Sequence, residues 1–363
     1  MGKIRVAIAG LGNCASSLVQ GLHFYKDADP NKHVPGLMHV KMGPYHVSDV
    51  EVVGAFDVNE KKIGKDVGQA IWEPTNCTAK FCDDVPAKTG AMVVPGPISD
   101  GVAPHMKNSF FTYDETKTKP VNVADQLKEW KTDVLINFIP VGSELATKIY
   151  AQGCLDSRVA FANGIPTFIV SDPEGVWPKK FADAGIPCAG DDIKSQLGAT
   201  ILHRALVNLA LDRGIAIEKT YQLNVGGNTD FENMKFEERL TTKRISKTSA
   251  VTSLLDKEVP TRIGPSDYVS FLKDRKICYL YLVGSNFGGC PLSIELKLNV
   301  EDSPNSAGVM IDVVRALKIA RDRKLVGALS SVSSYFFKHP PKQIIDSTAR
   351  QLVEDFIAGK IGN

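Results

Sequence analysis

A glycine-rich turn near the N-terminus is the first group of residues whose spacing could do chemistry. Gly10, Gly12 and Ala15 directly follow a short apolar run at residues 4–9. In a strand–turn–helix unit, the first glycine allows a tight turn, the second lets a pyrophosphate approach the backbone, and a small third residue keeps the helix close to the sheet. Amide groups at the helix start then face the phosphate charge. The pattern predicts a dinucleotide site, with a plain strand–helix turn as the alternative.

An acidic residue ends the second apolar run. Asp57 follows residues 50–56, where a carboxylate can bind the adenosine ribose hydroxyls. It lies later after Gly12 than the usual distance of about 20 residues, and the Pro- and Gly-containing segment 26–48 is predicted to be an inserted loop that accounts for the delay. An acid at this place favours NAD over NADP; an ordinary Asp at a strand end is the alternative.

A second group of chemically useful residues lies in Lys243-Arg-Ile-Ser-Lys247-Thr. The two lysines are four residues apart, so they would share one face of a helix. From spacing alone a solvated basic helix is the favoured interpretation. Ammonium groups can also stabilise negative charge that develops on oxygen, and burial near other cations lowers a lysine pKa enough for proton transfer near neutral pH. Spacing by itself leaves both interpretations open.

The elements that must position these residues follow two patterns. In the first, short apolar runs alternate with helical segments, as in a parallel sheet covered on both faces. It predicts strands at 4–9, 50–56, 134–138, 158–162 and 186–189, and helices at 123–130, 179–184 and 193–212, the last with Leu197, Ile201, Ala205 and Leu209 on one face. Residues 72–120 predict no clear element.

In the second pattern the apolar period changes to two. Tyr221, Leu223 and Val225 alternate with polar residues, as do Ile294, Leu296, Leu298 and Val300, and residues 276–283 are a further strand candidate. Such alternation is typical of an antiparallel sheet with one wetter face. An amphipathic helix after Ser306, reaching about Lys324, resumes the first pattern. We therefore predict an α/β fold: a Rossmann-type doubly wound parallel sheet in residues 1–198, interrupted by an α+β domain in 199–305, with a C-terminal helical segment, 306–363, that returns to the first domain.

The composition excludes several classes of protein. Among 363 residues, Lys and Arg total 43 and Asp and Glu total 41, so no overall charge favours nucleic acid or an anionic membrane. No apolar run is long enough to span a bilayer, and the N-terminus lacks the pattern of a signal peptide. The seven cysteines are scattered without a Cys-x-x-Cys pair, which indicates reduced thiols rather than disulfides or structural zinc. We expect a cytoplasmic protein that binds neither nucleic acid nor membrane.

Longer motifs that occur together and in one order decide between these interpretations. They are Gly10-Leu-Gly-Asn-Cys-Ala-Ser-Ser17, residues 35–46, Pro140-Val-Gly-Ser143, Gly190-Asp-Asp-Ile-Lys-Ser195, Gln222-Leu-Asn-Val-Gly-Gly-Asn-Thr-Asp230, Lys243 to Thr248, Ile263-Gly-Pro-Ser-Asp267 and Glu301-Asp-Ser-Pro-Asn-Ser-Ala-Gly308. The ordered set closely resembles the myo-inositol-1-phosphate synthase family in its shorter prokaryotic form. The resemblance runs from about Arg5 to Lys338. Eukaryotic members have a more glycine- and asparagine-rich fingerprint and extra segments that this chain lacks, so details of their cofactor loop are not carried over.

The resemblance implies a redox-neutral conversion of D-glucose 6-phosphate to 1D-myo-inositol 3-phosphate. In this family NAD takes hydride from C5, the ketone acidifies the C6 protons, the enolate attacks the C1 aldehyde, and the hydride is returned. Each step develops negative charge on oxygen, which is what lysines can stabilise. The implied catalytic lysines are Lys243, Lys247, Lys276 and Lys338. We expect Lys276 and Lys338 closest to hydride and proton transfer, and Lys243 and Lys247 at phosphate and ring oxygens.

The resemblance implies the other site residues as well. Asp302 matches a family carboxylate that orients a lysine or a sugar hydroxyl, with helix capping as the alternative. Asn224 and Asp230 are expected to contact sugar or cofactor. The expected cofactor-binding residues are Gly10, Gly12, Asn13, Cys14, Asp57, Asn137, Asp192 and Ser195. Asp192 could also cap the helix predicted from Ile193.

The remaining expectations concern the oligomeric state, bound cations and two alternative functions. The resemblance implies a homotetramer with the central sheet in the subunit interface. Family members differ in their use of divalent or monovalent cations; no metal ligand is assigned, although Asp191 or Asp192 beside a pyrophosphate would suit a cation. A net NAD-dependent sugar-phosphate dehydrogenase is one alternative, disfavoured because hydride transfer alone does not need four lysines. A dinucleotide-sensing regulator is the other, and the same lysines argue against it.

Overall fold

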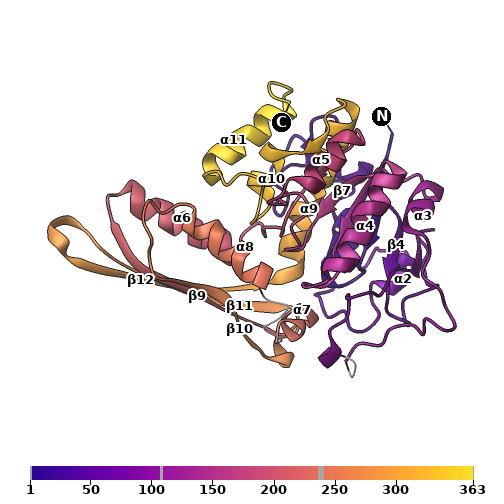
Figure 1. Ribbon diagram of the computed structural model, residues 1–363, viewed down its shortest axis with the longest axis horizontal. Coiled ribbons are helices and arrows are strands. Elements are labelled where there is room, and N and C mark those ends of the chain that lie inside the picture. The colour runs from indigo at the N-terminus through magenta and orange to yellow at the C-terminus, as the bar shows by residue number, and fades with distance from the viewer. Residues whose placement is uncertain (1, 107–108, 236–240, 363) are drawn as a thin grey trace.

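The computed structural model describes residues 2–106, 109–235 and 241–362, and its first layer is a seven-stranded sheet (Figure 1). Its neighbouring strands run parallel in the order β13-β8-β7-β6-β1-β4-β5. They are β1 Ile4–Ala9, β4 Val50–Asp57, β5 Met92–Pro95, β6 Val134–Asn137, β7 Ala160–Asn163, β8 Pro187–Ala189 and β13 Gly327–Ala328. The order proceeds outward on both sides of β1, so the predicted Rossmann-type sheet is confirmed, with its switch point between β1 and β6.

The strands of this sheet are apolar on both faces because helices cover both faces. Ile4, Val6 and Ile8 of β1 belong to one core and Ala7 and Ala9 to the other. The first core is covered by α1 Asn13–Phe24 and α9 Asp302–Asp322, and the second by α3 Val123–Glu129, α4 Glu144–Ser157 and α5 Val176–Asp183. Both α9 and β13 come from the C-terminal part of the chain, which therefore packs on the first sheet.

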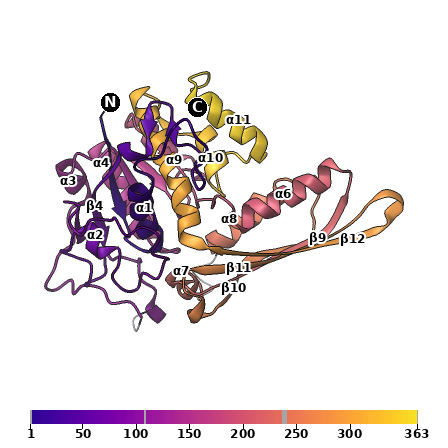
Figure 2. The same ribbon diagram turned by 180° about the vertical axis from the view of Figure 1, so that it is seen from behind.

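A second, four-stranded sheet extends away from the first as a long arm (Figures 1 and 2). Its order is β10-β9-β11-β12, with β9, β11 and β12 antiparallel and β10 parallel to β9. The strands are β9 Ala216–Gly226, β10 Thr261–Tyr268, β11 Arg275–Ser285 and β12 Pro291–Glu301. Helices α6 Ala199–Asp212 and α8 Thr241–Thr252 cover one face, where they enclose a third core.

Smaller elements connect these layers. They are the hairpin β2 Lys41–Met42 and β3 Tyr45–His46, the helices α2 Val67–Ala70, α7 Thr229–Asn233, α10 Ser330–Phe336 and α11 Asp346–Ile357, and the 3-10 turns Val47–Asp49, Pro104–Met106, Ser270–Leu272 and Phe287–Gly289. The predicted inserted loop 26–48 thus contains a short hairpin. The three-part division of the chain remains a prediction. Within the described residues, no helix has the length and apolar character needed to cross a membrane.

The helix predicted over residues 193–212 is shorter than expected, and its expected face is wrong. It begins at Ala199, with Gly198 as N-cap, so Asp192 does not cap it. Ile193 instead forms a bridge with Phe337, which draws residues 191–194 into extended pairing with the C-terminal segment. Leu197 and Leu209 are exposed, whereas the buried positions are Ala199, Thr200, His203, Arg204, Val207 and Ala210.

The sequence pattern predicted the alternation along β9 but did not reveal which of its two sets of side chains is buried. Its polar members Gln222 and Asn224 are buried toward the helices, while Tyr221 and Leu223 are exposed on the outer face. The polar side chains face inward because they line a pocket between the two sheets. The outer apolar side chains have no cover within the described part of this single chain.

Candidate active site

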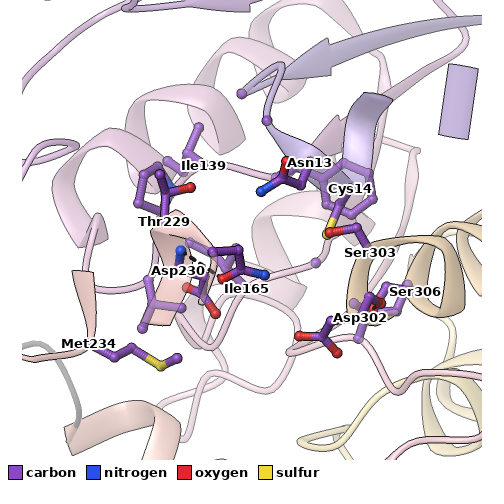
Figure 3. A pocket seen from close by; sticks show the side chains of 18 of the residues that line it. Asn13, Cys14, Ile139, Ile165, Thr229, Asp230, Met234, Asp302, Ser303 and Ser306 are labelled. Atoms are coloured by element: carbon purple, nitrogen blue, oxygen red, sulfur yellow. Dashed lines mark hydrogen bonds between the residues drawn. The ribbon is translucent and has the colours of Figure 1, made fainter. Parts of the chain in front are cut away.

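The pocket lies where the carboxyl ends of β1, β4 and β6 approach β9, β11 and α8 (Figure 3). Fourteen of the fifteen site residues predicted from the sequence line it: Gly10, Gly12, Asn13, Cys14, Asp57, Asp192, Ser195, Asn224, Asp230, Lys243, Lys247, Lys276, Asp302 and Lys338. Asn137 does not. Its buried amide donates to Asn163 Oδ1 at 2.9 Å and to Thr147 Oγ1 at 3.3 Å inside the sheet, so it ties two strand ends together.

The glycine turn has the geometry that a pyrophosphate needs. Gly10 has φ +87°, and a Cβ there would lie 2.8 Å from the carbonyl carbon of Phe138, so a larger residue does not fit. Gly12 is the N-cap residue of α1, so no side chain caps the first amides of this helix. It lines the pocket, and the space where a Cβ would lie is open. A side chain at Gly12 would fill the place of a phosphate on the helix N-terminus. The residues present therefore fit a dinucleotide.

Asp57 is buried at the end of β4 and already accepts two backbone hydrogen bonds, from Leu11 N and Asn59 N, both at 2.7 Å. Each carboxylate oxygen has a second lone pair, so ribose hydroxyls can still bind. Sequence reasoning missed Lys62, which is buried beneath the turn and donates to Leu11 O at 2.7 Å. Burial lowers the pKa of Lys62.

Asn13 and Cys14 occupy the first turn of α1. Asn13 Oδ1 accepts from Cys77 N at 2.7 Å and from Thr78 N at 3.1 Å, which fixes the loop beside the turn. Cys14 points toward Ser303 (Figure 3), with 3.8 Å between Sγ and Oγ. Burial and the nearby carboxylate of Asp274 raise the pKa of Cys14 to about 12. The thiol therefore stays protonated and cannot act as a nucleophile at neutral pH.

Three of the four lysines predicted to be catalytic are paired with carboxylates. Lys338 Nζ lies 2.8 Å from Asp192 and Lys243 Nζ lies 3.4 Å from Asp230. Lys276 forms an ion pair with Asp302, from the N-terminal turn of α9. The paired residues are 13, 26 and 146 residues apart in the sequence, and the fold gathers all three pairs around one pocket.

Lys247 differs from the other three lysines. Its ammonium has no ion-pair or hydrogen-bond partner among residues 2–106, 109–235 and 241–362. The residue is nevertheless buried, with only 8% of its surface exposed. Burial and the positive charges of Lys243, Lys338 and Lys276 lower the pKa of Lys247 to about 7. Near neutral pH this amine can therefore hold or release a proton.

The pKa values of the charged groups around Lys247 are shifted in different directions. Burial opposes the charge of Lys243, but Asp230, Asp192 and Asp302 outweigh it and raise its pKa. Burial likewise opposes the charge of Asp192, yet Lys338 and Lys243 lower its pKa to about 2. Burial lowers the pKa of Lys338 in spite of Asp192. Lys243 and Asp192 are therefore fixed charges, and the readily exchangeable proton belongs to Lys247.

Backbone pairing sets the Asp192–Lys338 contact. Asp191 and His339 exchange two backbone hydrogen bonds of 3.0 Å, and Lys338 N donates to Asp192 O at 2.7 Å. This short antiparallel ladder places the two side chains together. Ser246 of α8 donates to Asp192 Oδ2 at 2.7 Å, which joins the lysine-bearing helix to the same carboxylate.

Asp274 is a buried residue that sequence reasoning did not single out. Its carboxylate accepts from Asn228 Nδ2 at 3.0 Å and Ser303 Oγ at 2.8 Å, and its carbonyl accepts from Asp302 N at 2.9 Å. Burial raises the pKa of Asp274 to about 6. Because Asn228 caps α7, which carries Asp230, Asp274 links the surroundings of two lysine pairs. The only sequence signal for Asp274 was its position two residues before Lys276.

Asp191 and Asp192, the two candidate cation ligands, lie in different surroundings. Asp191 is buried, and its two oxygens accept from Asn163 Nδ2, Ser171 Oγ and the amides of residues 169, 170 and 171. Five donors leave it unsuited to a cation, and it does not line the pocket. In the described ranges, no three His, Cys, Asp or Glu side chains gather as a metal site. Asp192, which does line the pocket, is already paired with Lys338.

Fold and site together define a class: enzymes with a Rossmann-type sheet whose nucleotide edge faces a lysine-rich pocket. A family model described as myo-inositol-1-phosphate synthase matches residues 198–303. Inositol-3-phosphate synthase of Mycolicibacterium smegmatis is 53% identical over 367 residues, covering 99% of both chains, and that of Corynebacterium glutamicum is 53% identical, covering 98% of both. The chain belongs to the inositol-3-phosphate synthase family, as the resemblance in its sequence predicted.

Solved structures agree at the level of the fold. The crystal structure of Ari2 is 31% identical, covers 98% of this chain and 99% of its own, and has a TM-score of 0.78. A myo-inositol-1-phosphate synthase-related protein from Thermotoga maritima has a TM-score of 0.80 at 23% identity, over 98% of both chains. The overall fold is therefore shared with both of these solved proteins.

Proposed function

We propose that this enzyme converts D-glucose 6-phosphate to 1D-myo-inositol 3-phosphate in a redox-neutral, NAD-dependent cyclisation. The full-length identity of 53% to inositol-3-phosphate synthases supports the reaction. The observation that carries the chemistry is that Lys247 has no carboxylate partner among the residues the structure describes, whereas the three lysines beside it do. Such a set can stabilise several oxyanions and still move a proton.

The cofactor would be held by the glycine turn and Asp57. Gly10 and Gly12 would receive the pyrophosphate at the start of α1, and Asp57 would accept from the adenosine ribose hydroxyls. When bound, NAD supplies a reversible hydride acceptor for oxidation at C5 and for the final reduction. The carboxylate also disfavours a 2′-phosphate, because like charges repel.

The paired lysines would bind and orient the sugar phosphate. Lys243, Lys276 and Lys338 keep an ammonium donor next to a carboxylate, so each can donate to a phosphate or ring oxygen while its partner fixes its direction. Enolisation at C6 and closure onto C1 both place negative charge on oxygen, which these donors would stabilise.

Lys247 would accept and return the proton that enolisation moves. Its pKa of about 7 matches a general base at neutral pH. The resemblance assigned Lys276 and Lys338 to proton and hydride transfer; the charge pattern adds Lys247 as the base and leaves those two as oxyanion stabilisers.

The protein would act as a homotetramer through the outer face of the second sheet. Tyr221, Leu223 and Tyr279 on that face are 39%, 37% and 43% exposed in the single chain. Their register places Tyr279 opposite Leu223, so they form one continuous apolar surface. Contiguous exposed apolar surface of this kind marks protein–protein contact.

The reaction is tested by incubating the purified protein with glucose 6-phosphate and NAD. Product is followed by ³¹P NMR and NADH by absorbance. We expect inositol phosphate without net NADH. Lys247→Ala and Lys276→Ala should abolish it, while Lys179→Ala, on the exposed surface of α5, should not. Stoichiometric NADH with an oxidised sugar phosphate would instead assign a dehydrogenase, and no turnover of any sugar phosphate with bound NAD would favour a regulator.

A further inference from the structure

A buried charged network lies behind the pocket. Arg204 and Lys194 are 0% and 1% exposed, and neither they nor Asp346 line the pocket. Arg204 Nε donates to Asp346 Oδ2 at 2.5 Å, and Lys194 Nζ donates to Oδ1 of the same carboxylate at 3.1 Å. One carboxylate is thus held between two cations. A buried arrangement of this kind contributes little net stability, but each charge requires its partner at a short distance.

Each member of the network reaches a segment that carries a pocket residue. Lys194 lies in the ladder segment of Asp192 and also donates to Ser334 O at 2.8 Å. Arg204, on α6, donates to the carbonyl of Ala250 on α8, the helix of Lys243 and Lys247. Asp346 begins α11, in the same C-terminal segment as Lys338.

Arg204 adds a second tie to that segment, donating from Nη2 to Ile344 O at 2.8 Å. Its guanidinium therefore connects α8 and the start of α11 at a fixed spacing, because its donors lie in one rigid plane. The 2.7 Å hydrogen bond from Ser246 Oγ to Asp192 Oδ2 is a separate tie between α8 and the ladder segment.

We propose that Asp346, Arg204 and Lys194 form a positioning network that holds the lysine face of α8 against the Asp192–Lys338 pair. The inference rests on the proposed function, since it assigns the network a purpose in that reaction. Charge interactions fall with distance, and catalytic groups tolerate displacements of only about 0.5 Å. Loosening the network would move α8 outward and separate the ammonium groups of Lys243 and Lys247 from those of Lys276 and Lys338.

Asp346→Asn and Asp346→Glu test the proposal, with Asp312→Asn as the matched control. Asp312 is also buried on a helix and paired with an arginine, Arg315, but its network does not reach α8. The readouts are kcat, KM for glucose 6-phosphate, the Kd for NAD by fluorescence titration, and the melting temperature. A further readout needs no substrate: the pH midpoint of Lys247 labelling by acetic anhydride, measured by peptide mass spectrometry.

In Asp346→Asn we expect kcat to fall about 10- to 100-fold, as for small misplacements of reacting groups. The Kd for NAD should stay within about twofold (~0.4 kcal/mol), because the glycine turn is not part of the network. The Lys247 midpoint should rise above about 7, because Lys247 becomes less buried and the ammonium groups of Lys338 and Lys276 withdraw, while Lys243 moves with it on the same helix. Asp346→Glu keeps the charge and should restore part of kcat. Asp312→Asn should lower the melting temperature alone.

An unchanged Lys247 midpoint in both Asp346 variants, or the same shift in Asp312→Asn, overturns the proposal. A fall in kcat with an equal loss of NAD-binding capacity also overturns it, because both losses would then come from unfolded protein. If Asp346→Asn does not fold, Asp346→Glu decides by the same midpoint and kcat. If the parent enzyme makes no inositol phosphate, the proposed function fails, and the midpoint comparison still judges the network.

Discussion

Lys338 and Asp192 form an ion pair of 2.8 Å although 146 residues separate them in the chain. The pair is held by a backbone ladder between the end of the first sheet and the C-terminal segment. It joins the carboxyl edge of the first sheet to the lysine cluster. The C-terminal part of the chain therefore completes the site as well as covering the first sheet.

Lys247 is expected to reduce stability at acid pH while supporting activity. Its pKa is lowered to about 7 from 10.5 by burial and by the other lysines, so below pH 7 the folded protein carries a charge that folding disfavours. Between pH 7 and 10.5 the unfolded chain keeps a proton that the folded chain has released, so the penalty shrinks as the pH rises. Lys247→Met should raise the melting temperature more at pH 6 than at pH 9, and should abolish turnover. An equal gain at both pH values would contradict the charge explanation; exposed Lys179→Met serves as the control.

The two glycines of the turn should separate folding from binding. Gly12→Ala places a methyl group in open space at φ −82°, so the melting temperature should not change. The methyl would obstruct the phosphate, and the Kd for NAD should rise about tenfold or more, which is ~1.4 kcal/mol. Gly10→Ala should instead destabilise the fold by about 1–3 kcal/mol, because its φ is +87° and the Cβ meets Phe138. Thermal melts and NAD titrations of both variants measure this; equal effects on both quantities would refute it.

His39 should stabilise the protein at acid pH. Burial opposes its charge, but the hydrogen bonds and negative charges of Asp312 at 2.5 Å and Glu354 at 3.2 Å leave its pKa raised above 6.5. A raised folded-state pKa gives stability that is fully present below pH 6.5 and is lost as the pH rises through the folded value. His39→Gln should therefore lower the melting temperature more at pH 5.5 than at pH 9. His33→Gln, at an exposed position, should show no such difference, and a pH-independent loss in His39→Gln would rule out the charged pair.

The outer face of the second sheet should control assembly. Tyr279→Asp introduces a charge into the apolar surface and should convert the proposed tetramer to smaller species, measured by light scattering after size-exclusion chromatography. Val176→Asp, at a similarly exposed site on α5, is the control. A parent protein that is already monomeric, or a variant with unchanged mass, would disprove this interface.

Much of the first sheet could be predicted because its signals are local. The apolar runs that became β1, β4 and β6 are interrupted only by Arg5 and Glu51, and strands buried on both faces need such a pattern. The helix expected from Ile193 failed for a non-local reason: residues 191–194 pair with the C-terminal segment, and that pairing outweighs a helical pattern. The β9 alternation was visible, but which of its two faces is buried depends on the pocket.

The sequence by itself determined which residues could do chemistry: the glycine turn, Asp57 and the four lysines belong to motifs that are contiguous along the chain. Only the tertiary structure decided how those groups behave. Lys243 and Lys247 are four residues apart, yet one has a raised pKa beside Asp230 and the other a lowered pKa without a carboxylate partner in the described chain. Burial and distance to charges on other segments set these differences, and neither quantity can be read from spacing along one helix.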